Sequence, residues 1–190
     1  MIKQLISLGF VLSLAACGAN SDDVIGSGNE GTGSGSLSFT YTGDGGSGTF
    51  QAAGAAPTNN SLGTWAGGAR VNDEGETTVL VTAVTKSGSD YDMIGIQLDG
   101  NAPGTYDMGG NCETNCAYAV AAFGITSWTD SGERACFIDE GTVTVTALSA
   151  TEARGTFSGK GSCITGEEFD EPFQVSGGTF DVKVIDLGNG

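Results

Sequence analysis

The sequence contains no histidine among its 190 residues, and only three prolines. The absence of histidine excludes Ser-His-Asp and Cys-His catalytic groups, histidine metal ligands and the commonest general base. Basic residues are also scarce: seven lysines and arginines against 23 acidic residues give a formal net charge of −16. A surface of this charge repels other polyanions, so we expect no binding of nucleic acid.

No apolar run in the N-terminal region is long enough to span a bilayer, which needs about 20 residues. Leu5–Leu14 is a shorter apolar run that follows Lys3 and ends at Leu14-Ala15-Ala16-Cys17. This order is typical of an export signal that is removed from the mature protein. The cysteine directly after two small residues resembles the bacterial lipoprotein signal, in which the cysteine thiol receives a diacylglyceryl group before cleavage. We therefore expect residues 1–16 to be a signal peptide and Cys17 to be lipidated.

An acylated Cys17 is expected to hold the mature chain on a lipid bilayer, because several acyl chains anchor stably where one does not. Gly18 stands where an aspartate tends to retain lipoproteins of Gram-negative bacteria at the inner membrane. This resemblance favours the outer membrane of the cell envelope. Cleavage removes one base, Lys3, so 23 acids and six bases remain and the formal charge becomes −17.

Composition divides the mature chain into two parts. Residues 17–35 hold the lipidated cysteine and a stretch rich in Gly, Ser, Asn and Asp, which is typical of a flexible tether. Residues 36–190 show no second change in composition and are enough for one domain with a real core.

The odd number of cysteines, five, is explained if Cys17 carries lipid. The other four are Cys112, Cys116, Cys136 and Cys163. An even set in an exported domain predicts two disulfides. A hairpin that pairs Leu148 with Ala153 places Cys136 nearly opposite Cys163, so we favour a Cys136–Cys163 and a Cys112–Cys116 bridge. The Cys112-x3-Cys116 spacing also fits zinc, but no histidine is present to complete such a site.

Apolar and polar residues alternate with a period of two from residue 36 onward, as in Thr142–Leu148 and Thr179–Val184. Threonine falls on the polar side, which is typical of half-buried strands. We predict an all-β domain of about eight to ten short antiparallel strands, either a β-sandwich or a partly closed β-barrel. Ala117–Phe123 fits either a strand or a short buried helix.

The tripeptide Gly-Thr-Phe occurs at 48–50, 155–157 and 178–180. We expect each phenylalanine to face the core, with the glycine two residues earlier leaving room for it. Together with the lipoprotein signal and Gly-Thr-Val-Thr-Val-Thr (141–146), these motifs resemble small β-rich bacterial lipoproteins of uncharacterised function. The resemblance supports the fold and the anchor, and implies no catalytic residue.

Acidic residues are the remaining candidates for chemistry, either as a catalytic pair or as calcium ligands. They are Asp90 with Asp92, Asp139 with Glu140, and Glu167, Glu168, Asp170 and Glu171, with Asp44, Asp73 and Glu74 as further calcium candidates. All lie in turn-like or strand-end stretches where acids usually face water, so we expect no catalytic residues, no metal site and no cofactor, with a structural calcium as the alternative. Gly43–Gly48 matches the dinucleotide fingerprint but has no helix after it, and is predicted to be a hairpin turn.

Aromatic residues fit either the ends of a β core or a groove for sugar or peptide, and we favour the core. They are Trp65, Tyr91, Tyr106, Tyr118 and Trp128. The sequence thus predicts a membrane-anchored, non-enzymatic envelope lipoprotein that binds an unknown protein or glycan or forms part of the surface. A β-barrel carrier of a small apolar ligand is the alternative.

Overall fold

The computed structural model describes residues 35–43, 46–55, 62–73, 76–109, 112–127, 132–165 and 168–189. These residues form ten β-strands, and the domain is all-β as the alternation predicts. The strands are β1 (Gly35–Gly43), β2 (Gly46–Gly54), β3 (Trp65–Asp73), β4 (Glu76–Ser87), β5 (Asp90–Asp99), β6 (Gly104–Met108), β7 (Cys116–Ile125), β8 (Arg134–Leu148), β9 (Glu152–Thr165) and β10 (Glu168–Asn189). Within the described ranges, no helix has the length and apolar character needed to cross a membrane.

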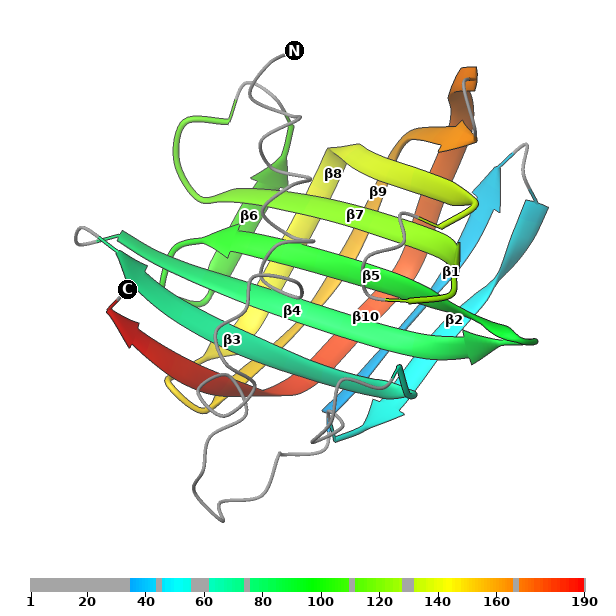
Figure 1. Cartoon of the computed structure of the whole chain (residues 1–190). Coiled ribbons are helices and arrows are strands. Elements are labelled where there is room, and N and C mark those ends of the chain that lie inside the picture. Colours follow the sequence, from blue (N-terminus) through cyan, green and yellow to red (C-terminus); the bar gives the residue numbers. More distant parts are fainter. Residues whose placement is uncertain are drawn as a thin grey trace.

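Hydrogen bonds close the strands into a ring. The ring runs through β3, β4, β5, β7, β8, β9 and β10 and returns to β3. Figure 1 shows two crossed layers, with β3, β4, β5 and β7 in front and β8, β9, β10, β1 and β2 behind them. The sequence leaves sandwich and barrel open, and the structure combines them, since the two layers of a sandwich are joined by continuous hydrogen bonding.

Two long strands belong to both layers. The first half of β8 pairs with β7, and its second half pairs with β6 along the same edge. β10 pairs with β1 up to Asp181 and then with β3 from Val184 onward. A strand can turn from one layer into the other where a bulge bends it, and β8 and β10 each contain such register shifts. The predicted short strands are therefore wrong for β8 and β10, which have 15 and 22 residues.

Alternating apolar residues fill the space between the layers. Phe39, Phe50, Phe157 and Phe180 each have at most 3% of their surface exposed. Their rings are in contact: Phe39 stacks on Phe50 with centroids 4.9 Å apart, and lies edge-on to Phe157 at 5.7 Å. Tyr41 continues this chain of aromatic rings to Phe123, 5.0 Å away. Aromatic rings thus occupy the interior that the ring of strands encloses.

The Gly-Thr-Phe motif has a different packing from the one we expected. The three phenylalanines do face the core, but each glycine makes room for a ring on the neighbouring strand and not for its own phenylalanine. A Cβ on Gly155 would lie 2.7 Å from Cζ of Phe180, and a Cβ on Gly178 would lie 2.7 Å from Cδ1 of Phe157. Gly155 is directly opposite Phe180, and Gly178 is opposite Phe157. The motif therefore pairs an aromatic ring with a glycine across strands, a known means of packing strands that contain glycine.

The structure also bears on one predicted turn, one ambiguous segment and one short strand. Gly43 of β1 pairs with Gly46 of β2, as the predicted hairpin requires, and Asp44 and Gly45 lie outside the described residues. Ala117–Phe123 lies within β7, so the helical alternative for this segment is wrong. β6 has only five residues and was not anticipated, because its single Tyr106–Met108 alternation is too short to be recognised.

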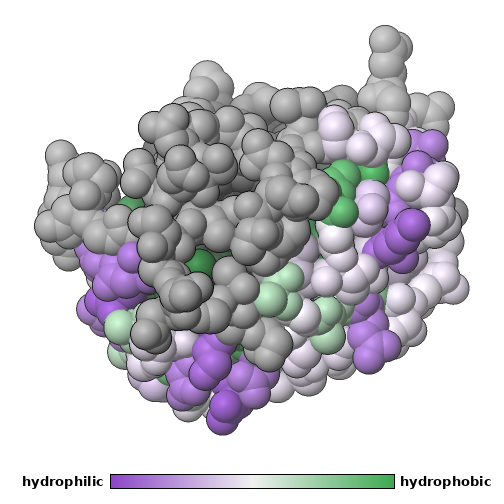
Figure 2. Space-filling model, turned by 60° about the horizontal axis from the view of Figure 1, so that its bottom comes forward, coloured by the Kyte–Doolittle hydropathy of each residue, from purple (hydrophilic) through white to green (hydrophobic). Residues whose placement is uncertain are grey.

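The outer side of the front layer carries a second, smaller apolar cluster. It consists of Val84, Met93, Ala122 and Ile125, with Leu62, Trp65 and Tyr91 packed against it. Among the described residues, Ile185 is the one large hydrophobic side chain that is exposed, at 40%. Figure 2 shows the described surface from below as hydrophilic and neutral residues with small, separate hydrophobic patches.

Candidate functional site

The outer side of the back layer is covered by hydroxyl groups. Threonine and serine alternate with buried residues along four neighbouring strands, so that their side chains all point away from the core. We call this surface the hydroxyl face: Ser38, Thr40 and Thr42 on β1, Thr142 and Thr144 on β8, Thr156 and Ser158 on β9, and Ser176 and Thr179 on β10. The pairing register makes these side chains neighbours across the four strands. Thr144 is opposite Thr156, Thr156 is opposite Thr179, and Thr179 is opposite Ser38.

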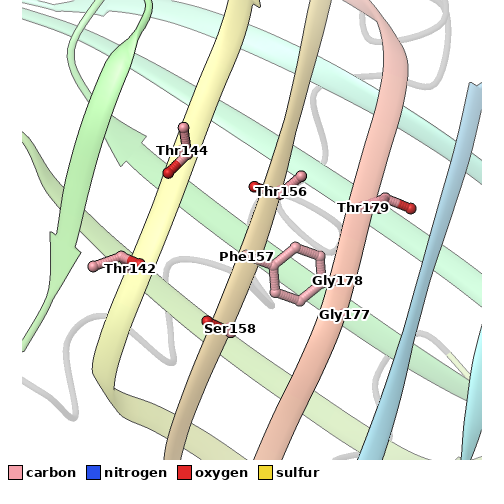
Figure 3. Close-up of a pocket in the computed structure, with 8 residues that line it drawn as sticks. All are labelled: Thr142, Thr144, Thr156, Phe157, Ser158, Gly177, Gly178 and Thr179. Atoms are coloured by element: carbon pink, nitrogen blue, oxygen red, sulfur yellow. The ribbon is translucent and has the colours of Figure 1, made fainter.

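A shallow hollow of about 270 Å³ lies in the hydroxyl face. Its lining includes Thr142 and Thr144 of β8, Thr156 and Ser158 of β9, and Gly177–Thr179 of β10. Figure 3 shows these residues on three adjacent strands, with the two glycines beside the ring of Phe157. The hollow forms at a bulge in β10, where the register to β9 shifts between Val175 and Gly178. Gly177 has a φ of 61° at this bulge, a conformation that favours glycine, and a Cβ there would meet no atom within 4 Å, so the space beside it stays open.

Within the hydroxyl face, the hydroxyls on β1 and β10 differ in their hydrogen-bond partners from those around the hollow. On β1 and β10 they bond to one another: Ser38 to Thr179 at 3.1 Å, and Thr40 to Ser176 at 2.9 Å. Around the hollow, the hydroxyls of Thr142, Thr144, Thr156 and Ser158 have no hydrogen-bond partner in the part of the chain that the structure describes. Each can both donate and accept, so the hollow offers unoccupied hydrogen-bonding groups of both kinds.

A second hollow, also about 270 Å³, lies on the same face. It is lined by Thr42 and Gly43 of β1, Lys160 and Gly161 of β9, and Pro172–Gln174 of β10. Thr42 pairs with Gln174, which pairs with Lys160, so this hollow lies on the same β9–β10 pair as the first one. The two hollows therefore follow one another along the seam between β9 and β10.

Ion pairs mark both ends of the hydroxyl face. Arg154 Nε lies 3.0 Å from Asp181 Oδ2 at one end, and Lys160 Nζ lies 2.6 Å from Glu140 Oε2 at the other. The hydrogen bond to Glu140, assisted by its negative charge, raises the pKa of Lys160 above its ordinary value. Since each charge is paired with its opposite, the region between the two ends is close to neutral on a strongly acidic protein.

The four described cysteines form two disulfides, Cys112–Cys116 and Cys136–Cys163. Leu148 pairs with Ala153, as the hairpin prediction requires, and two register shifts bring Cys136 directly opposite Cys163. Both sulfurs of the second bridge belong to the core, with Cys136 and Cys163 at most 2% exposed. In the chain-entropy model the longer loop stabilises the fold by roughly 3.5 kcal/mol and the shorter one by about 2 kcal/mol. Cys17 lies outside the described residues.

The acidic candidates do not converge on either hollow. Glu140 is engaged by Lys160, Asp90 accepts from Ser89 at 3.0 Å, and Asp92 accepts from the Gly124 amide at 3.2 Å. Within the described ranges, no three acidic or cysteine side chains are grouped closely enough to hold a metal ion. Asp139 is exposed on β8 and lines neither hollow. The remaining acidic candidates have side chains outside the described residues: Asp44, Asp73, Glu74, Glu167, Glu168, Asp170 and Glu171.

Most of the aromatic candidates belong to apolar clusters. Tyr106 is 2% exposed and donates to the carbonyl of Ala102 at 2.7 Å. Trp65 and Tyr91 pack against the second apolar cluster, and Tyr118 is half-buried on β7. None of these four lines either hollow, and Trp128 lies outside the described residues.

The chain matches no protein-family model, no curated protein and no solved structure. The likeness to small β-rich lipoproteins therefore depends on the sequence motifs, and the candidate site depends on its own geometry. Sequence reasoning recognised threonines on the polar side of the strands, but it missed their assembly into one face, because that requires the pairing of strands far apart in the chain.

Proposed function

We propose that the protein is a lipid-anchored module of the bacterial cell envelope that binds its partner without chemical conversion. The Leu14-Ala15-Ala16-Cys17 motif supports the anchor. The hydroxyl face supports binding, because its two hollows are open, follow one another along the same pair of strands, and the first contains hydroxyls with no partner among the described residues. The single observation that carries the proposal is this unoccupied group of hydroxyls on an exported domain.

The alternative of a carrier for a small apolar ligand has less support. A carrier needs an apolar cavity of several hundred Å³ inside the barrel. In the described interior, contacts between Phe39, Phe50, Phe157 and Phe180 occupy that space. Both hollows instead lie on the outer side of the back layer.

The anchor is tested by measuring the intact mass of the protein purified from its own membranes. We expect a mass equal to residues 17–190 plus two or three acyl chains, with four alkylated cysteines appearing only after reduction. A Cys17→Ser variant is the matched control, since it keeps the four remaining cysteines and removes only the acylated thiol. Because acylation precedes cleavage, the variant should carry no acyl mass and should keep residues 1–16, with its four downstream cysteines still paired.

Two results would contradict the proposal. An unmodified Cys17 in the membrane-derived protein would remove the lipid anchor. Free thiols without reductant would exclude the two disulfides and reopen a redox or metal role for the four cysteines downstream.

A further inference from the structure

The hydroxyl face suggests a class of ligand for the proposed binding function, on which this inference rests. We propose that the outer surface of β8, β9 and β10 binds an extended, uncharged polysaccharide. One sugar unit would lie in the first hollow, over Thr142 and Thr144 of β8 and Thr156 and Ser158 of β9, and a neighbouring unit in the hollow of Lys160 and Gln174 on β9 and β10.

Hydrogen-bond chemistry favours a polyhydroxylated ligand. The four partnerless hydroxyls of the first hollow can each donate and accept, which is also the character of sugar hydroxyls. Pairs on neighbouring strands are about 4.8 Å apart and alternate residues along a strand about 6.7 Å apart. Thr142 is opposite Ser158 and Thr144 is opposite Thr156, so the four hydroxyl-bearing residues form a rectangle close to the footprint of one sugar ring.

Charge favours a neutral ligand over an anionic one. The described lining of the first hollow contains no charged side chain, and Lys160 in the second is already paired with Glu140 at 2.6 Å. An anionic polysaccharide would find no unpaired cation in either hollow, and the acidic protein around it would repel the ligand. A cationic ligand would prefer the many exposed acids elsewhere on the surface.

Shape favours a polymer over a single sugar. Each hollow has about 270 Å³ and is open to solvent, whereas sites that enclose a small molecule usually have about 300–1,000 Å³. A single sugar would therefore bind weakly in either hollow. Two hollows on the same pair of strands allow linked sugar units to bind together, which raises the overall affinity without any new contact.

The test is binding of the full mature lipoprotein, in detergent, to immobilised polysaccharides: an α-glucan, a β-glucan, a mannan and a galactan as neutral probes, and polygalacturonate as the anionic probe. We expect retention on at least one neutral polysaccharide and none on polygalacturonate. Thr144→Val/Thr156→Val keeps the shape of both side chains and removes their hydroxyls, and should weaken binding by about tenfold or more.

Two further variants separate the role of the hollow from that of the face. Thr49→Val/Thr105→Val changes two exposed threonines on β2 and β6, outside both hollows, and should bind as the natural protein does. Ser158→Phe should abolish binding by filling the first hollow, since an exposed strand position accepts an aromatic side chain. Melting temperatures within a few degrees of the natural protein would show that the variants remain folded.

The outcomes distinguish this inference from the proposed function. No retention on any neutral polysaccharide, equal retention on polygalacturonate, or equal losses in the hollow and control variants would overturn the inference. In the last case the protein would still be a glycan-binding module, with its site elsewhere. An unlipidated Cys17 in the same preparation would overturn the anchor and leave the hollow unaffected.

Discussion

Single glycines determine how the aromatic core packs. Gly155 and Phe180 lie opposite each other on β9 and β10, and the ring lies over the glycine. The same arrangement occurs with Gly178 and Phe157, and with Gly48 and Tyr41. In each pair the absent side chain is as important as the ring, because interiors packed to crystal density have no space for an additional methyl group.

Gly155→Ala is expected to destabilise the protein by about 1–3 kcal/mol through overpacking. The new Cβ would lie 2.7 Å from Cζ of Phe180 and would also clash with the Thr144 carbonyl oxygen. Chemical denaturation with urea measures the change. Gly63→Ala is the control, since a Cβ there meets no atom within 4 Å and the variant should be close to neutral. Equal stability of the two variants would contradict the packing we describe.

At the scale of elements, β10 is the strand that closes the ring. It pairs with β9 along most of its length, with β1 through its first part and with β3 through its last part. Its alternation continues into this last part, where Val182 and Val184 are buried and Ile185 is exposed. The contact of Val184 with β3 therefore joins the back layer to the front layer.

Val184→Thr is expected to destabilise the protein by about 1–3 kcal/mol, because a hydroxyl replaces a methyl group in a site that is 6% exposed. Ile185→Thr, at the adjacent position, should change stability by no more than about 0.5 kcal/mol. Both variants keep a β-branched residue, so strand propensity is nearly constant. Thermal melts of the pair provide the comparison, and a larger loss for Ile185→Thr would mean that β10 presents its other side to the core.

The whole molecule is a ring of strands whose partners are mostly far apart in the sequence. The first strand, β1, pairs with the last, and β3 pairs with residues more than a hundred positions later. Such non-local pairing makes the fold cooperative, since the back layer needs both β1 and β10 and the ring closes only when the end of β10 pairs with β3. It also predicts slow folding, on the order of milliseconds to seconds.

A chain that begins at Gly35 is therefore expected to form both disulfides and to unfold in one cooperative transition. Coincident loss of far-ultraviolet circular dichroism and of tryptophan fluorescence during denaturation would show this. A chain that begins at Gly46, and so lacks β1, should lose this cooperativity because Phe39 leaves the aromatic core. Two separate transitions in the longer chain would argue against a single domain.

Local features of the sequence determined much of this protein. The period of two in Thr142–Leu148 and Thr179–Val184 specified strands with one buried side, since successive side chains point to opposite faces. The Leu148–Ala153 register of one hairpin was also local, and it placed Cys136 near Cys163. Each of these depends on residues close together in the chain.

Only the tertiary structure decided the features that depend on distant residues. The parallel pairing of β3 with β10 closed the ring, and no local pattern distinguishes that pairing from an open sandwich. The hydroxyl face and its hollows arose in the same way, because β1, β8, β9 and β10 contribute threonines and serines from four separate stretches of sequence. Side-chain alternation fixes which residues point outward, whereas strand order fixes which of them become neighbours.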